Sequence, residues 1–485
     1  MSTRSTQWQR RWIGGLLLLF WLVGCARQPT VPRDPGAVAC ERLYRGLAGA
    51  VDAHGVSPSS PAPLPGFPQL ALDRFHVQLG QWATDPSSTG AWLARLESLG
   101  AERRAVQLAS LPEGVRADLA LGDTAQALTD CATVLTRRDR QDPARLARLR
   151  AARVADDYHT TWRVLGLYPL SSLPVQAGVA RYHAETRVRF DIPLMALPVV
   201  GELRRYRSPP GNPVIAPLPR DELDVPVADA TQLSALFHRH APVWEVDTTG
   251  AFDRIGVPYW RAPGVPDVDP ATPVVYRHVS YSFWQERPVL QLNYLVWFAA
   301  RPPEKPLDIL AGRLDGVHWR VTLDHDGEAL VYDTIHPCGC YHMLFPTDRL
   351  RPRPDALRLR EPPLIPQSAP RPAPDERLVL RIASGSHYIQ RVYADRPAGR
   401  VVEFRPYRAL YRIVDADGSS ASLFGEGGLV AGTERAERWL LWPMGIASPG
   451  AMRERGRHAI AFVGRRHFDD PDLLERFFRA VLVSP

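Results

Sequence analysis

The sequence predicts an α+β protein, with an N-terminal α-helical domain followed by a C-terminal domain rich in antiparallel β-sheet. Up to about residue 190, apolar residues recur at steps of three and four, as they do along one face of a helix. From about residue 242 they alternate with polar residues, which is the period of a strand. A proline-rich stretch separates the two patterns. We therefore expect a helical domain over residues 37–190, a connector over 191–228 and a β-rich domain over 229–485.

The first 24 residues have the features of a secretory signal peptide. Arg4, Arg10 and Arg11 precede an uncharged apolar run of 11 residues, Ile13 to Val23. This run is too short to cross the hydrocarbon core of a bilayer, which needs about 20 helical residues for about 30 Å. It is therefore typical of the central region of a signal peptide rather than of a membrane-spanning helix.

The end of this run, Leu22-Val23-Gly24-Cys25, resembles the lipobox of bacterial lipoproteins. The resemblance covers residues 1–25 and implies that Cys25 is lipidated and becomes the first residue of the mature chain. Residues 25–36 would then be a tether that leads away from the membrane. Ala26 stands where an Asp would favour retention in the inner membrane, so the resemblance implies attachment to the outer membrane, facing the periplasm. Several acyl chains together anchor a protein durably.

The composition excludes several classes of function. With 45% hydrophobic and 23% charged residues, the chain is typical of a folded protein. The formal charge of +7 includes three signal-peptide arginines, and no basic patch with interleaved aromatic residues is present, so nucleic acid is not expected as a partner. The sequence also contains no glycine-rich phosphate loop and no Gly-x-Ser-x-Gly motif. Its 47 prolines predict extended segments, among them an exposed Arg/Pro-rich insertion over residues 351–376.

Two cysteines of the helical half share one predicted environment. The clearest helical windows cover Trp92–Leu99, Thr124–Leu135 and Val175–Arg187. Cys40 and Cys131 each fall on the apolar face of a helical pattern. Because the periplasm permits disulfides, two interpretations stay open: a disulfide between two helices, or two buried free thiols.

The second half opens with a predicted short helix over residues 229–240 and continues as strands. Two pairs of alternating segments predict β-hairpins: 274–284 with 289–298, and 318–323 with 329–335. The first pair is joined by four residues, 285–288, and the second by a stretch that contains Asp326-Gly327, a favoured dipeptide of tight turns. Further strands are predicted at 378–382, 388–393, 401–404, 410–414 and 458–463, with a closing helix after Pro471.

The stretch from Asp333 to Met343 concentrates more reactive side chains than any other window of the sequence. It contains an acid and four alternating residues, which are His336, Cys338, Cys340 and His342. In an extended strand all four would point to one face. Because thiolate and imidazole are ligands that suit zinc or copper, this pattern predicts a candidate metal site.

Two other interpretations of this stretch stay open. A neighbouring histidine could lower the pKa of a thiol and create a cysteine nucleophile, with Asp333 orienting the imidazole. Alternatively, the stretch is a structural turn whose two cysteines form a disulfide or are simply buried. Three residues elsewhere are candidate supporters of a site: His278 and Asn293, which share one face of the first predicted hairpin, and His387, which lies in a predicted turn.

The sequence thus leaves two functional hypotheses open. The first is a lipid-anchored envelope protein, facing the periplasm, that has a binding or assembly role and contacts the membrane, other envelope proteins or a cell-wall component. The second is a metal-binding protein, or a periplasmic enzyme that depends on a metal or a cysteine, centred on the stretch from His336 to His342.

Overall fold

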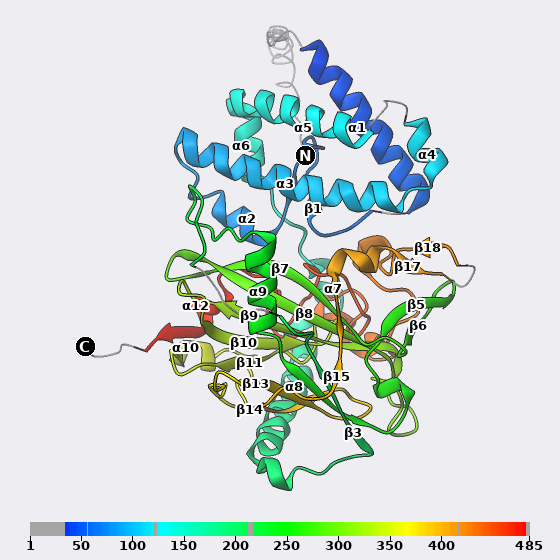
Figure 1. The fold of residues 1–485 in the computed structure, drawn as a ribbon, viewed down its shortest axis with the longest axis vertical. Helices are drawn as coiled ribbons and strands as arrows, with labels where there is room; N and C mark the ends of the chain where they lie inside the picture. Colours follow the sequence, from blue (N-terminus) through cyan, green and yellow to red (C-terminus); the bar gives the residue numbers. More distant parts are fainter. Residues whose placement is uncertain (1–33, 56, 120–123, 212–216, 416–417, 482–485) are drawn as a thin grey trace, which may run out of the picture.

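The computed structural model describes residues 34–55, 57–119, 124–211, 217–415 and 418–481 of the 485-residue chain. The predicted signal peptide and the predicted lipidation site, Cys25, lie outside the described residues. A layer of helices formed by the N-terminal part of the chain lies above a body of β-sheets, so the predicted α+β class is confirmed (Figure 1). Among the described residues, no helix combines the length and the apolar character that crossing a membrane requires.

The helical layer is built by the first six helices. They are α1 (Pro35–His54), α2 (Arg74–Leu79), α3 (Pro86–Ser110), α4 (Glu113–Asp118), α5 (Thr124–Gln141) and α6 (Pro143–Ala151). Three of them begin alike: Asp34, Asp85 and Asp142 accept hydrogen bonds from amides of the first turn, and a proline follows each of them. These aspartates satisfy amides that have no partner inside the helix, and the prolines occupy positions where no amide is needed.

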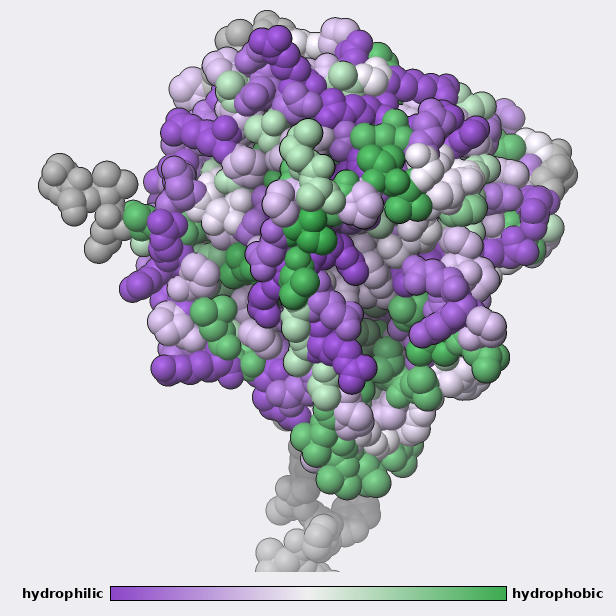
Figure 2. Space-filling view, turned by 90° about the horizontal axis from the view of Figure 1, so that it is seen from below, coloured by the Kyte–Doolittle hydropathy of each residue, from purple (hydrophilic) through white to green (hydrophobic). Residues whose placement is uncertain are grey.

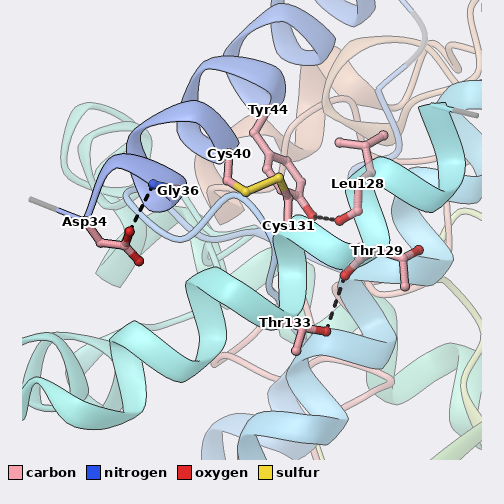
Figure 3. Close-up of a disulfide and its surroundings, with 8 residues drawn as sticks. All are labelled: Asp34, Gly36, Cys40, Tyr44, Leu128, Thr129, Cys131 and Thr133. Atoms are coloured by element: carbon pink, nitrogen blue, oxygen red, sulfur yellow. Dashed lines mark hydrogen bonds between the residues drawn. A yellow bond between two sulfur atoms is a disulfide. The ribbon is translucent and has the colours of Figure 1, made fainter. Parts of the chain in front are cut away.

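A disulfide joins α1 to α5. It connects Cys40 with Cys131, 91 residues apart in the sequence (Figure 3). Beside it, the hydroxyl of Tyr44 donates a hydrogen bond of 3.0 Å to the carbonyl of Leu128. Of the two interpretations that the sequence left open for these cysteines, the structure contains the disulfide.

Two further helices lie against the sheets rather than in the helical layer, although the sequence places them before residue 190. They are α7 (Thr160–Leu165) and α8 (Tyr168–Asp191), and α8 contacts strand β14 (Ile389–Asp395) and the short helix η5 (Trp442–Met444). In Figure 1, α8 lies at the end of the molecule opposite α1. The helical layer therefore ends near residue 151.

The larger sheet has six strands in the order β11-β10-β9-β8-β7-β16. Their bounds are β7 (Val274–Trp284), β8 (Arg287–Arg301), β9 (Gly312–Leu323), β10 (Ala329–Ile335), β11 (Met343–Pro346) and β16 (Glu403–Pro406). All neighbours are antiparallel except β16, which runs parallel to β7. The two hairpins expected from the alternating segments are both present in this sheet.

The first hairpin turns more tightly than expected. Trp284 pairs with Arg287, which leaves Gln285 and Glu286 as a two-residue turn with φ of 52° and 61°. Two consecutive positive φ angles are the geometry that matches the twist of a tight hairpin. The shorter turn shifts the pairing by two residues, so the faces of the strands remain those that the sequence predicts.

The smaller sheet has five strands in the order β14-β13-β4-β3-β15. Its other bounds are β3 (Glu202–Arg207), β4 (Val243–Thr248), β13 (Arg377–Ile382) and β15 (Arg400–Val401). Strand β3 lies inside residues 191–228, the stretch expected to be a connector. Helix α9 (Ala230–Arg239) matches the short helix expected over residues 229–240. The main apolar core fills the space between the two sheets and includes Trp244, Tyr294 and Trp319.

The remaining elements are short. They are β1 (Ala62–Pro63), β2 (Ala71–Leu72), β5 (Val257–Ala262), β6 (Val265–Asp269), β12 (Leu350–Pro352), α10 (Pro354–Leu357), β17 (Ile413–Val414), β18 (Ser420–Ala421), α11 (Arg438–Leu441), α12 (Leu473–Phe477) and β19 (Phe478–Ala480), with 3₁₀ helices at Leu194–Ala196, Ala251–Asp253, Tyr407–Tyr411 and Glu426–Gly428. Two expectations fail here. Segment 410–414 begins as 3₁₀ helix, and only Ile413 and Val414 form a strand, while segment 458–463 contains a single bridge, from Ala459 to His467, instead of a strand. The insertion over 351–376 is not wholly exposed, because Ala356 and Leu364 are buried.

Candidate functional site

A cavity of about 690 Å³ lies between α8, the chain segment 338–342 and the segments that surround them. Its walls are mostly apolar: Pro174, Val175 and Val179 come from α8, Leu440 comes from α11, and Ile460 comes from the opposite wall. This volume is within the range of about 300–1,000 Å³ that is usual for small-molecule sites.

One wall of the cavity is the stretch that the sequence singles out. The chain leaves β10 at Ile335 and turns at Gly339 and Tyr341, which have φ of 89° and 61°. The amide of His336 donates to the carbonyl of Cys340 at 3.1 Å and closes the turn. A Cβ atom at Gly339 would lie 2.5 Å from the carbonyl oxygen of Ala459, so glycine is required both by φ and by space. This stretch is therefore a turn, which is one of the interpretations that the sequence left open, and not the extended strand that would place the four side chains on one face.

The two cysteines of this turn are reduced. The sulfur of Cys338 accepts a hydrogen bond of 3.3 Å from the amide of Cys340, and both residues line the cavity. The hydrogen bond to Cys338 and burial raise the pKa of the Cys340 thiol well above its usual value. A raised pKa keeps the thiol protonated at neutral pH, whereas a nucleophile needs the thiolate. A lowered thiol pKa, one of the interpretations left open, is thus not found at Cys340. The two cysteines are not joined to each other, so of the two forms of the structural-turn interpretation the structure contains the one without a disulfide.

His342 also lines the cavity, and Asp333 contacts its ring. Its Nε2 atom lies 3.1 Å from Oδ2 of Asp333, and Asp333 forms a two-pronged ion pair with Arg320 at 2.9 and 2.5 Å. Burial acts to raise the pKa of Asp333, but the charge of Arg320 and the hydrogen bond with His342 lower it to about 2. Burial lowers the pKa of His342, so its imidazole is neutral at pH 7. Asp333 therefore orients this histidine, as the sequence suggests.

His336 belongs to a second group, which is a buried chain of two histidines and two aspartates. Its Nδ1 atom lies 3.0 Å from Asp315, whose other carboxylate oxygen lies 2.8 Å from Nδ1 of His387. Nε2 of His387 lies 3.3 Å from Asp253. Burial opposes a charge on His387, but the hydrogen bonds and charges of the two aspartates outweigh it and raise the pKa of His387. The two aspartates thus favour the protonated form of His387, which is connected to the turn through Asp315.

His278 and Asn293 lie opposite each other on β7 and β8, as expected, but they do not line the cavity. Asn293 donates to the hydroxyl of Ser280 at 2.9 Å, and its amide oxygen lies 3.0 Å from Nε2 of His318. The ring of His318 contacts that of His278 at a centroid distance of 5.5 Å. Asn293 and His318 are therefore buried and hydrogen-bonded, whereas His278 and Ser280 are half-buried and His278 contacts His318 through its ring.

The candidate metal ligands do not converge. The cysteines contact each other, His336 faces Asp315 and His342 faces Asp333. Within the part of the chain that the structure describes, no group of three or more His, Cys, Asp or Glu side chains is placed to hold a metal ion. Zinc or copper at this stretch stays a prediction from the sequence.

Several polar groups of the cavity have no signal in the sequence. Glu437 is 7% exposed, and burial raises its pKa to about 7, against the opposing charges of Arg435 and Arg301. Three tyrosines pack together on the same wall, with ring centroids 4.5 to 5.8 Å apart: Tyr182, Tyr341 and Tyr388. These tyrosines come from three segments that are distant in the sequence, so only the folded structure shows that they lie together.

No protein-family model, curated protein or solved structure matches the chain.

Proposed function

We propose that the protein is a binding protein of the cell envelope whose cavity takes an apolar, chain-like ligand such as the acyl chain of a lipid. The observation that carries this proposal is the cavity itself, which has a volume of about 690 Å³ and mostly apolar walls. An apolar ligand gains free energy by leaving water for such a cavity, at about 25 cal/mol per Å² of buried apolar surface. A lipid-anchored protein facing the periplasm, which is what the lipobox resemblance implies, would meet such ligands.

The polar groups of the cavity favour a ligand whose head group is uncharged or weakly polar. His342 and the thiol of Cys340 are neutral at pH 7, and Glu437 is half protonated there. The tyrosine hydroxyl of Tyr388 is already occupied, because it accepts a hydrogen bond of 2.9 Å from Arg301. Because a charged group loses its hydration on entering a cavity, a ligand without a charge fits these surroundings better.

Filling the cavity tests this proposal. A Cβ atom at Gly178, on the face of α8 that lines the cavity, would meet no other atom within 4 Å, so Gly178→Trp places an indole in open space. Gly49 in α1 is equally open and lies outside the cavity, so Gly49→Trp is the matched control. Titration with the uncharged apolar fluorophore N-phenyl-1-naphthylamine is expected to show saturable binding that Gly178→Trp weakens at least about tenfold and Gly49→Trp does not. Equal affinity of all three proteins, or no saturable binding by the unsubstituted chain, would refute the proposal.

A second candidate function is a thiol- or metal-dependent activity, which one observation favours: the two reduced cysteines line the cavity side by side. Such an activity requires conditions that remove the proton of Cys340, for example a bound zinc or copper ion. Metal analysis and thiol titration of the chain purified without reductant test it. One equivalent of metal that is lost in Cys338→Ser/Cys340→Ser would establish this function, and two free thiols without metal would leave the binding role.

A further inference from the structure

The surface beside the cavity carries an unusual number of exposed apolar side chains. Eight of them, between 38% and 70% exposed, come from α7, the start of α8, α11 and η5, and we call them the apolar collar: Val164, Leu165, Leu167, Leu170, Leu173, Trp439, Leu440 and Trp442. Hydrophobic residues also gather in patches on the face seen from below, the end of the molecule where α8 lies (Figure 2). Soluble monomers rarely expose a contiguous apolar patch of this kind without a function.

The collar comes from three segments of the chain, which are α7, the start of α8, and α11 with η5, and these segments are neighbours in space. The end of α7 abuts η5, because a Cβ atom at Gly166 would lie 2.4 Å from Cβ of Pro443. Nε of Arg163 donates to the carbonyl of Met444 at 2.8 Å, which fixes α7 on the same segment. Helix α8 starts two residues after Gly166 and also contacts η5. The collar is therefore one surface and not a set of scattered side chains.

The collar also borders the mouth of the cavity. Leu440 is 63% exposed and at the same time lines the cavity. Ser171 and Pro174, which flank Leu173 on α8, line the cavity as well. An apolar molecule that moves between the collar and the cavity would thus remain in contact with apolar surface.

We propose that the apolar collar docks on an anionic lipid surface, with the cavity mouth facing the acyl chains. This inference rests on the proposed function, because it names the source from which the cavity takes its ligand. Leucine, valine and tryptophan side chains insert into the interfacial region of a bilayer, and tryptophan is enriched there. The collar offers two such tryptophans, Trp439 and Trp442, which are 70% and 38% exposed.

The charges around the collar favour a lipid over a second copy of the chain. Helices α7 and α8 carry four arginines against one glutamate and one aspartate; Arg163 lies in α7 beside collar residues, whereas the exposed Arg181 and Arg187 lie further along α8. The guanidinium of Arg438 lies 4.8 Å from the ring of Trp439, at the edge of the collar. Anionic head groups attract such arginines. A two-fold dimer through the collar would instead place the same arginines of both copies close together.

Flotation of the protein with lipid vesicles tests the docking. The chain from Asp34 onward contains every described helix and strand, so it is the suitable sample and has no acyl anchor of its own. It is expected to bind phosphatidylcholine vesicles that contain phosphatidylglycerol, and to bind pure phosphatidylcholine more weakly. The variant Leu167→Ser/Leu170→Ser/Trp439→Ser is expected to lose binding at least about tenfold. The control Val227→Ser/Val401→Ser/Val414→Ser removes three exposed apolar side chains elsewhere and is expected to bind as before.

Three outcomes would overturn the docking proposal. They are equal vesicle binding by the collar variant and the control, no binding by the unsubstituted chain, or a dimer in sedimentation velocity that the collar variant abolishes. The docking and the ligand-binding proposals fail separately. Gly178→Trp is expected to keep vesicle binding while losing N-phenyl-1-naphthylamine, and the collar variant is expected to keep N-phenyl-1-naphthylamine binding in solution while losing the vesicles.

Discussion

The two faces of the six-stranded sheet are both buried, but they are buried in different ways. On strand β9, Trp319 and its second neighbours along the strand point into the apolar core between the sheets. Arg320 and its second neighbours, His318 and Thr322, point to the other face and are equally buried. The chain near Phe468 covers that face. The carbonyl of Phe468 accepts a hydrogen bond of 2.6 Å from Arg320, and the guanidinium of Arg320 lies 3.6 Å from the centre of the Phe468 ring. The alternation of apolar and polar residues along this strand therefore separates an apolar buried face from a polar buried face, and not a buried face from a solvent-exposed one.

The difference shows what each face does for the cavity. The apolar face joins the sheets by burial, which is not directional. On the polar face each buried polar side chain needs a hydrogen-bond partner, so each side chain fixes the position of its neighbour. The strand register places His278, Asn293, Arg320 and Asp333 in one row across four strands, and Asp333 holds His342 at the cavity wall. The polar face thus positions the site, whereas the apolar face stabilises the fold.

The largest effect is expected on the apolar face. Trp319→Ala removes one of the largest fully buried side chains and is expected to lower the free energy of unfolding by about 3–5 kcal/mol. Trp319→Phe retains most of the buried surface and serves as the control, with a smaller loss. Urea denaturation followed by circular dichroism measures both. A loss below about 1 kcal/mol for Trp319→Ala would mean that the core between the sheets is not packed as described.

The polar face is expected to respond to pairs rather than to single residues. Arg320→Met leaves the buried carboxylate of Asp333 without its cation and is expected to cost about 3 kcal/mol. Replacing both members, in Arg320→Met/Asp333→Leu, removes the unpaired charge and is expected to restore part of this loss. The same denaturation experiment compares the single and double variants. A double variant as unstable as the sum of the two single variants would show that the pair does not act as a unit.

A third prediction concerns how the free energy of unfolding depends on pH. Apolar side chains do not titrate, so this dependence comes from polar groups. Burial opposes the charge of His467, but Asp157 and Asp470, within 3.4 and 3.6 Å of its ring nitrogens, raise its pKa to about 9. A histidine with a raised pKa stabilises the folded state fully below its unfolded pKa, near 6.5, and this stability is lost as the pH rises through the folded pKa. We therefore expect the free energy of unfolding to fall by up to about 3 kcal/mol between pH 6.5 and 9.5.

His467→Gln provides the control for this pH dependence. It is expected to be less stable than the unsubstituted protein at pH 6.5 and to lose less stability as the pH rises. Denaturation curves at half-unit pH steps compare the slopes. An unchanged slope in His467→Gln would assign the pH dependence to other groups, such as His387, whose pKa is also raised.

The strands of this sheet could be predicted because their evidence is local. The period of two between 274 and 298, and the Asp326-Gly327 turn, are properties of neighbouring residues, and the structure contains both hairpins. Strand β3 was missed because its sequence is mostly charged and its stability comes from pairing with β4. The fold class was therefore predictable, while the membership of α7, α8 and β3 in the sheet body was not.

The candidate site was predictable in its position and not in its chemistry. The turn from His336 to His342 does line the cavity, apart from His336 itself and Pro337. However, two acids beside the turn, Asp315 and Glu437, are isolated in the sequence and are brought near the turn by the fold. A pattern of alternating ligands could not reveal that Gly339 and Tyr341 adopt positive φ and turn the chain.

The smallest expected effect lies in the cavity itself and links ligand binding to pH. Glu437 has a pKa raised to about 7 by burial, so it is neutral below pH 7 and charged above it. An apolar ligand removes more water from this carboxyl group and thus binds the neutral form better. The affinity for the uncharged fluorophore N-phenyl-1-naphthylamine is expected to fall about three- to tenfold between pH 6 and 8. Glu437→Gln is expected to keep the high affinity across this range, because the amide never ionises. If Glu437→Gln shows the same fall in affinity, the carboxyl group does not control the ligand, and the polar end of the cavity would have to be assigned to His342 and the tyrosines instead.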